Sequence, residues 1–373
     1  MTCDFQQRAD GWACSKCGRV ARSQRRPVAE CSDRQPAVCP YLGQRLRTAP
    51  SINCPSLRRD VPIHLCQLHG VETAGAMCSE GRKRWAGRTC LECRDAGENV
   101  PQTLPLEAIT GKRHNFNAGL TRWGDGWLIA WRTNRAHLVG EKAEVWLARA
   151  DEQFLSIDAP ERFEVDGSHE DPRLLTFRGR VILQTYDSAL GCLRLFEVAN
   201  QREIVIDHFR AGQKNWAFFE GPGAEPCCVW YPSHGKQHKV IEFRWAGPWR
   251  LEPVREHFTP ATMFPPEFGE ARGGAPPVLR AGRFWHWFHG RQQAGGVLDY
   301  TLGVYTFEAV PPFRPLKCSP VMLRSPRVID GKRVVFVCGA AVSGGEWVIT
   351  AGLDDLTTIV LRWPVEYVEG VLR

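Results

Sequence analysis

Residues 170–186 read EDPRLLTFRGRVILQTY, and this stretch decides the class of fold. Two short runs rich in apolar and β-branched residues, 173–177 and 181–186, flank Arg178-Gly179-Arg180. Such runs on either side of a glycine-containing turn indicate a β-hairpin. The stretch therefore predicts two antiparallel strands, with the acidic pair Glu170-Asp171 where the first strand begins.

Similar hairpin signals recur on both sides of this stretch. Their turns lie near residues 124, 179, 222, 282 and 331. A recurrence of roughly 50 residues, with about four short strands per unit, is typical of β-propeller blades. We therefore predict an all-β fold in which residues 115–373 form a five-bladed β-propeller. An irregular pair of β-sandwiches is the alternative that the pattern leaves open.

The composition agrees with such a fold. The chain has 373 residues, 43% of them hydrophobic, which leaves room for two domains with cores of their own. Its 35 glycines, 26 prolines and 14 tryptophans suit short strands and tight turns better than helices. No apolar run approaches about 18 residues, and no charged-then-apolar leader follows Met1. The sequence thus predicts a cytoplasmic protein that does not enter a membrane.

The first hundred residues differ from the rest in cysteine content and charge. Ten of the fifteen cysteines lie in residues 1–93, and residues 1–100 hold 16 Lys and Arg against 10 Asp and Glu. The odd cysteine count and the lack of a leader favour reduced thiols over disulfides. We predict a small Cys-rich, zinc-ribbon-like domain over residues 1–98. A linker is predicted over 99–114, because its prolines and small polar residues match neither core.

Cysteine spacing in the N-terminal domain suits structural zinc. A Cys-x2 pair lets two side chains reach one tetrahedral ion, and the metal would stabilise a segment with little apolar material. The alternative is that these residues are ordinary thiols in a loosely folded arm. The predicted ligands form one site from Cys14, Cys17, Cys31 and Cys39 and a second from Cys66, His69, Cys90 and Cys93, with Cys54 competing for a place.

The basic excess of this domain bears on its partners. Arginine-rich segments at 19–26 and 82–88 could touch nucleic acid, but such runs more often form a solvated face. Aromatic residues are thinly interleaved among them, so we expect no nucleic-acid partner. A protein partner that docks on the N-terminal domain is a further possibility.

Polar clusters recur where the predicted blades begin or their strands end. In a propeller the innermost strands converge on one axis, so residues far apart in sequence meet there. Carboxylates exchange protons with hydroxyl groups, and aromatic faces cover the apolar side of a sugar ring. A carbohydrate site is therefore predicted from the clusters that contain Asn117, Arg132, Glu170, Asp171, Arg173, Lys214, His289 and Asp355.

Residues 115–373 resemble the β-mannoside phosphorylase and hydrolase family of five-bladed propellers, glycoside hydrolase family 130. The run Asn115–Gly119, with Gly124-Asp125-Gly126 and Arg132, resembles the first blade of that family. Glu170-Asp171-Pro172-Arg173 resembles its Asp-Pro-Arg motif. The resemblance implies that Asp171 donates the proton to the glycosidic oxygen.

The same resemblance implies site roles for further residues. Gly274–Pro277 with His289 resembles a fourth-blade run that carries a histidine in the phosphate or acceptor site, and Gly352-x2-Asp355 resembles a last-blade contact with sugar hydroxyls. Tyr300 falls where the family often has a site tyrosine, and Arg272 where a lysine is usual. Lys214-Asn215-Trp216 departs from the phosphorylases and is closer to propeller relatives associated with glycan-assembly glycosyltransferases.

These observations predict an inverting hydrolase or phosphorylase that acts on glycosidic bonds of mannose-type glycans without a catalytic cofactor. Asp171 would donate a proton, and Glu170 together with desolvation would raise the pKa of Asp171. Two alternatives remain at this stage. One is a glycosyltransferase of the same fold, and the other is a non-catalytic propeller that binds a glycan or a protein.

Overall fold

The structure is a computed structural model whose chain divides into two units, Met1–Val100 and Pro101–Arg373. In the second unit it describes residues 101–112, 114–133, 142–207, 214–325 and 327–373. In the first unit it describes the backbone of five short strands.

The first unit contains two small antiparallel sheets. β1 (Phe5–Arg8), β2 (Gly11–Cys14) and β3 (Val20–Ala21) form one, and β4 (Ser51–Cys54) pairs with β5 (Arg59–Pro62) in the other. The side chains of the predicted zinc ligands lie outside the described residues, so zinc stays a prediction. Within the described part of the chain, no cluster of His, Cys, Asp and Glu has the arrangement of a metal site. The ligands concerned are Cys14, Cys17, Cys31, Cys39, Cys66, His69, Cys90 and Cys93.

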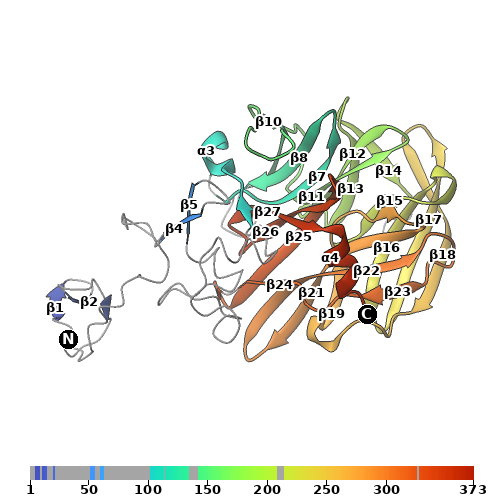
Figure 1. The fold of residues 1–373 in the computed structure, drawn as a ribbon. Coiled ribbons are helices and arrows are strands. Elements are labelled where there is room, and N and C mark those ends of the chain that lie inside the picture. Colours follow the sequence, from blue (N-terminus) through green and yellow to red (C-terminus); the bar gives the residue numbers. More distant parts are fainter. Residues whose placement is uncertain are drawn as a thin grey trace. The chain divides into compact units, whose positions relative to one another are not determined.

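The second unit is built almost entirely from antiparallel strands, so the all-β prediction is confirmed (Figure 1). Along the chain its strands fall into five groups of neighbouring, mostly antiparallel strands, called meanders below; the first is a sheet of its own, and the other four are linked into one 18-stranded sheet. The first consists of β7 (Phe116–Trp123), β8 (Gly126–Thr133), β9 (Glu144–Ala150) and β10 (Glu161–Arg162). The second consists of β11 (His169–Phe177), β12 (Arg180–Asp187), β13 (Cys192–Glu197) and β14 (Arg202–Ile206).

The other three meanders follow the same pattern. The third consists of β15 (Ala217–Glu220), β16 (Pro226–His234), β17 (Gln237–Gly247) and β18 (Arg250–Pro260). The fourth consists of β19 (Glu270–Gly273), β20 (Val278–Arg280), β21 (Arg283–Ala294), β22 (Val297–Glu308), β23 (Pro315–Cys318) and β24 (Leu323–Arg324). The fifth consists of β25 (Lys332–Ser343), β26 (Glu346–Leu353), β27 (Thr357–Pro364) and β6 (Gln102–Thr103). The meanders equal the predicted blades in number, and their closure around one axis stays a prediction.

The last meander is completed by the beginning of the unit, because β6 pairs with β27. Leu104 and Leu106 are buried in the same core cluster as Trp127 and Trp131, and α3 (Leu106–Thr110) follows β6. The structure therefore differs from the predicted linker over 99–114: residues 101–112 belong to the second unit. The few apolar side chains of this segment pack in the core beside β27, and the local sequence does not show that this packing occurs.

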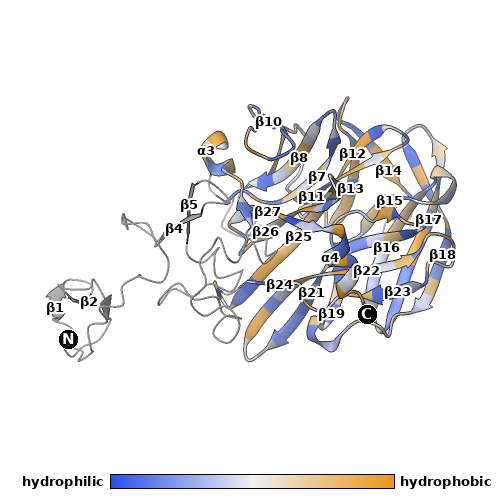
Figure 2. Cartoon of the chain, in the orientation of Figure 1, coloured by the Kyte–Doolittle hydropathy of each residue, from blue (hydrophilic) through white to orange (hydrophobic). Residues whose placement is uncertain are grey.

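Apolar clusters lie between consecutive meanders. One cluster joins Leu128 and Leu147 of the first meander to Leu174 and Leu183 of the second, and others lie between the second and third and between the third and fourth. Figure 2 shows hydrophobic and hydrophilic residues alternating along the strands, as expected where side chains point to opposite faces. Among the described residues, no helix has the length and apolar character needed to cross a bilayer. Two further short helices are η2 (Pro222–Ala224) and η3 (Pro266–Phe268), and α4 (Val365–Val371) ends the chain.

The first strands of different meanders approach one another closely. A Cβ at Gly119 of β7 would lie 2.8 Å from the Cα of Arg173 in β11, so only glycine fits between these backbones. The hydroxyl of Thr350 in β26 donates to the carbonyl of Ala118, 2.5 Å away. This close packing brings the first residues of β7 and β11 together, and the functional site forms there.

Candidate functional site

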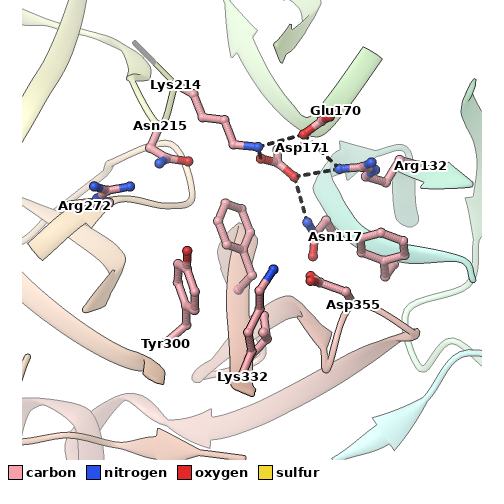
Figure 3. A pocket seen from close by; sticks show the side chains of 13 residues that line it. Asn117, Arg132, Glu170, Asp171, Lys214, Asn215, Arg272, Tyr300, Lys332 and Asp355 are labelled. Carbon is pink, nitrogen blue, oxygen red and sulfur yellow. Dashed lines mark hydrogen bonds and ion pairs between the residues drawn. The ribbon is translucent and has the colours of Figure 1, made fainter. Parts of the chain in front are cut away.

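A pocket with a volume of about 170 Å³ lies where strands and turns of the first, second, fourth and fifth meanders meet the segment that precedes β15 (Figure 3). Sites that enclose drug-sized ligands usually measure several hundred Å³. This pocket therefore suits the enclosure of one ring-sized group. It is lined by Phe116, Asn117, Arg132, Glu170, Asp171, Lys214, Asn215, Arg272, Tyr300, Lys332, Val334, Phe336 and Asp355.

Two irregular strand positions aim side chains at the pocket. Asn117 in β7 and Asp171 in β11 have φ values of 56° and 52°, and the pairing register shifts around each of them. Asn and Asp adopt this left-handed region more readily than other non-glycine residues. Bulges of this kind commonly turn a side chain out of its strand beside an active site. Here they place the Asn117 carboxamide nitrogen 2.7 Å from Oδ1 of Asp171.

Two cations hold the acidic pair. Nη1 of Arg132 lies 3.2 Å from Oε2 of Glu170 and 3.5 Å from Oδ1 of Asp171. Nζ of Lys214 lies 2.7 Å from Oε2 of Glu170 and 3.3 Å from Oδ2 of Asp171 (Figure 3). Arg132 and Asp171 are almost completely buried, whereas the Lys214 side chain is 37% exposed. Lys214 is thus the cation that a ligand can reach from solvent.

Opposing influences act on the Asp171 carboxyl. Burial is the largest influence and raises its pKa, but the charges of Lys214, Arg132 and Arg173 and the hydrogen bond from Asn117 together lower the pKa below its usual range. The expectation of a raised pKa for Asp171 is therefore wrong in this structure. The sequence pattern shows the neighbouring Glu170 but not the cations that converge from other meanders.

Glu170 and Asp171 act as one anionic cluster. One oxygen of each carboxylate contacts the same Lys214 nitrogen, at 2.7 and 3.3 Å, so these two oxygens lie close together. In inverting hydrolases the two carboxyl groups are about 6.5–9.5 Å apart, which leaves room for a water molecule between them. This pair therefore lacks the spacing of an acid and a base in an inverting hydrolase. The third carboxylate of the pocket, Asp355, lies across from them beside Lys332 (Figure 3).

The wall opposite the acidic pair carries two more cations and a phenol. Arg272 is oriented by Glu270, whose Oε2 accepts from Nε at 3.0 Å and from Nη2 at 2.7 Å. Tyr300 and Lys332 point into the pocket (Figure 3). Within the part of the chain that the structure describes, the Lys332 ammonium has no ion pair, so it is available to an anionic group.

Three buried acceptors on lining residues have no hydrogen-bond donor among the described residues. They are Oδ2 of Asp171, which has only the ionic contact with Lys214, Oδ1 of Asn215 and Oδ1 of Asn117. Asn215 is 6% exposed, and Figure 3 shows its carboxamide directed toward the pocket. A buried acceptor without a donor costs free energy. A ligand that brings hydroxyl donors would remove that cost.

Eight predicted site residues line the pocket, and two do not. Arg173 lies behind the pocket, 1% exposed, and donates through Nε to the carbonyl of Gly274 at 2.6 Å. His289 is fully buried, and its ring centre lies 4.3 Å from that of Phe336. Burial, followed by the charge of Arg173, holds the pKa of His289 well below its ordinary value, so the imidazole is neutral. The eight are Asn117, Arg132, Glu170, Asp171, Lys214, Arg272, Tyr300 and Asp355.

The sequence analysis missed several lining residues. Lys332 follows Gly331, and this position predicted a hairpin turn rather than a site. In the structure the backbones of Ile329 and Lys332 pair across Asp330-Gly331, and Lys332 is the first residue of β25. Asn215 stands beside Lys214 in a quoted motif, and that adjacency was the available signal. The others are apolar or aromatic, which single-residue patterns cannot distinguish from core: Phe116, Val334 and Phe336.

Comparison with known proteins supports the fold. No protein-family model matches the sequence, and no curated protein sequence matches it. A putative glycosidase from Bacteroides thetaiotaomicron is similar in structure, with a TM-score of 0.52 and 15% identity over 68% of this chain and 87% of that chain. A putative glycoside hydrolase from Parabacteroides distasonis is similar with a TM-score of 0.51 and 15% identity over 67% and 86%.

A third similar structure was solved in a study of the GH130 family of mannoside phosphorylases. According to that study, the family contains glycoside hydrolases that target β-1,2-mannosidic linkages in Candida mannan. That structure is 14% identical, with a TM-score of 0.51, over 68% of this chain and 85% of that chain. At these identities the likeness establishes a shared fold. The second unit is therefore an all-β domain with the fold of these glycoside hydrolases.

Proposed function

We propose that this protein is a carbohydrate-active enzyme that acts on glycosidic bonds of mannose-type glycans. The five meanders would be the blades of a propeller with the pocket at its axis. The carrying observation is the set of buried acceptors, among them Oδ2 of Asp171 and Oδ1 of Asn215, that lack donors in the described chain. Sugar hydroxyls supply such donors, and the aromatic lining can cover the apolar face of a sugar ring.

Lys214 is proposed to control the proton on Asp171. Burial favours the protonated acid, and Lys214 is the strongest of the charges that oppose it. If Lys214 moves onto a ligand group, the largest charge that opposes protonation is withdrawn, so the pKa of Asp171 rises and favours uptake of the proton that a general acid needs. Asp171 would give this proton to the bridging oxygen as the bond from the anomeric carbon to that oxygen breaks.

The nucleophile is proposed to attack the anomeric carbon from the opposite face. Phosphate would be held by Arg272 and Lys332 and needs no base. Water would lose its proton to Asp355, the carboxylate on the other side of the pocket. Lys332, which has no ion pair among the described residues, favours phosphate, because it adds a second cation to Arg272 on that side of the pocket.

An assay with β-linked mannosides, with and without inorganic phosphate, tests this function. Mannose 1-phosphate formed only with phosphate would show phosphorolysis, and free mannose would show hydrolysis. Turnover that requires a sugar nucleotide would instead select the glycosyltransferase alternative. Saturable binding of mannosides without any turnover would contradict an enzyme and leave a glycan-binding protein.

Zinc in the N-terminal unit is proposed separately, from cysteine spacing alone. Elemental analysis of purified protein that has never been exposed to a chelator tests this proposal. Less than half an equivalent of zinc per chain would contradict the proposal.

A further inference from the structure

A chain of buried hydrogen bonds runs beneath the pocket. The backbone nitrogen of Gly274 lies 3.3 Å from Nε2 of His286. Nδ1 of His286 lies 3.0 Å from the hydroxyl of Tyr305, and that hydroxyl lies 2.9 Å from Nε2 of His238. His286 and Tyr305 are fully buried and His238 is 1% exposed, so solvent cannot compete for these contacts.

Chemistry fixes the direction of both hydrogen bonds that His286 makes. A backbone N–H can only donate, so Nε2 of His286 accepts from Gly274. Burial holds the pKa of His286 well below its ordinary value, and burial lowers that of His238 to about 3, so both rings are neutral. Neutral His286 must then carry its proton on Nδ1 and donate to Tyr305. Tyr305 then has its own proton to donate, and Nε2 of His238 accepts it when the ring proton of His238 is on Nδ1.

The Gly274 end of this hydrogen-bond network contacts Arg173. The peptide unit between Gly273 and Gly274 donates its N–H to His286, and its carbonyl lies 3.5 Å from Nη2 of Arg173. The next carbonyl, of Gly274, accepts from Nε of Arg173 at 2.6 Å. A Cβ at Gly274 would lie 2.5 Å from the carbonyl oxygen of Trp287, so this backbone has little room to shift.

Arg173 connects these carbonyls to the acidic pair. Its Nη1 lies 3.5 Å from the carbonyl oxygen of Asp171, and its charge acts on the Asp171 carboxyl. Asp171 has a positive φ of 52°, a conformation that persists only where its surroundings enforce it. A fixed Arg173 supplies part of that enforcement.

We propose that His286 and Tyr305 are positioning residues that hold Arg173, and through it Asp171, in working geometry. Neither residue lines the pocket, so neither contacts a ligand there. The kinetic part of this inference rests on the proposed function, whereas the structural part does not. Small displacements of a catalytic group cost large factors in rate, which makes such support measurable.

Two variants break the chain, and one restores it. Tyr305→Phe removes the bridging hydroxyl, and His286→Leu removes the acceptor for Gly274. His286→Gln places an amide oxygen where it can accept from Gly274 again. In substrate-free protein, NMR exchange of the Arg173 Nε proton should be about 10-fold faster in the first two variants and partly restored in the third. On a mannoside, kcat should fall about 10-fold with KM nearly unchanged.

Phe284→Leu is the matched control, because Phe284 packs in the same core cluster as Tyr305 but makes none of these hydrogen bonds. It should lower thermal stability without accelerating Arg173 exchange. The inference is overturned if exchange is unchanged in Tyr305→Phe and His286→Leu, or if Phe284→Leu accelerates it equally. If wild-type protein turns over no glycoside, the proposed function fails alone, and the exchange rates still decide for or against the positioning role.

Discussion

The carboxamide nitrogen of Asn117 lies 2.7 Å from Oδ1 of Asp171, and both residues have positive φ. Each stands at a shift of register near the start of its strand, so two distortions of the sheet produce one contact between the first and second meanders. Because Asn117 holds Oδ1, the second oxygen of the carboxylate is left to Lys214 and to a ligand.

Substitution of Asn117 should separate hydrogen bonding from backbone strain. Asn117→Gly keeps the positive φ accessible and removes the donor, so kcat/KM on a mannoside should fall about 10-fold. Asn117→Ala also removes the donor but adds a strain of about 1 kcal/mol, because alanine disfavours this conformation. Kinetics and thermal melts of both variants check this. Full activity in Asn117→Gly would contradict a role for the hydrogen bond.

Asp171→Asn tests the proposed general acid. Asparagine adopts a positive φ readily and keeps the shape, but it has no transferable proton. Activity on an unactivated mannoside should fall roughly 10²–10⁴-fold, and a substrate with a very good leaving group should lose much less. Equal losses on both substrates would count against proton donation, and wild-type activity would leave Glu170 as the candidate.

The same substitution should change the pH dependence of stability. The pKa of Asp171 in the folded protein lies below its unfolded value of about 3.9. Its ionised form therefore stabilises the fold above that pH, and the stabilisation is lost as pH falls toward the folded pKa. The melting temperature of wild type should exceed that of Asp171→Asn by a constant amount between about pH 5 and 7, and the gap should close below about pH 4. A gap that widens on acidification would contradict this.

Sequence periodicity predicted the hairpins because each is a local event. The stretches around Arg178-Gly179 and Ala281-Gly282 contain both strands and the turn within about 15 residues, and both form as predicted. The pairing of β6 with β27 could not be predicted in this way. It joins residues more than 250 positions apart through two backbone pairs, and nothing in the segment 101–112 marks it as a strand.

For the site as well, local motifs could be predicted from the sequence, whereas contacts between distant segments could not. Glu170, Asp171 and Asn117 stand in recognisable motifs at strand starts, and the structure brings them together. The electrostatic balance was not predictable, because it depends on which cations of other meanders come within 4 Å of the pair. Arg173 and His289 were wrongly predicted to line the site. Each belongs to a motif near the pocket, but its side chain is buried in the core.

Lys332→Met should reveal whether the pocket binds phosphate as nucleophile. The methionine keeps much of the side-chain volume and removes the charge, so KM for phosphate should rise about 10-fold while KM for the mannoside changes little. Lys317→Met, on an exposed strand position away from the pocket lining, is the matched control. An unchanged KM for phosphate in Lys332→Met would contradict the proposal that Lys332 holds phosphate.

Gly352→Ala should disable the site through Asn117. Gly352 lies in β26 and pairs with Phe336 of β25, and a Cβ there would lie 1.8 Å from Oδ1 of Asn117, so the carboxamide that donates to Asp171 must move. We expect a loss of about 1–3 kcal/mol in unfolding free energy and an activity as low as that of Asn117→Gly. In the double variant with Asn117→Gly the clashing oxygen is absent, so much of the lost stability should return while activity stays low. Gly247→Ala, which has no heavy atom within 4 Å of its added Cβ, is the control and should melt like wild type. Additive losses in the double variant, measured by chemical denaturation, would show that Gly352 acts on something other than the Asn117 side chain.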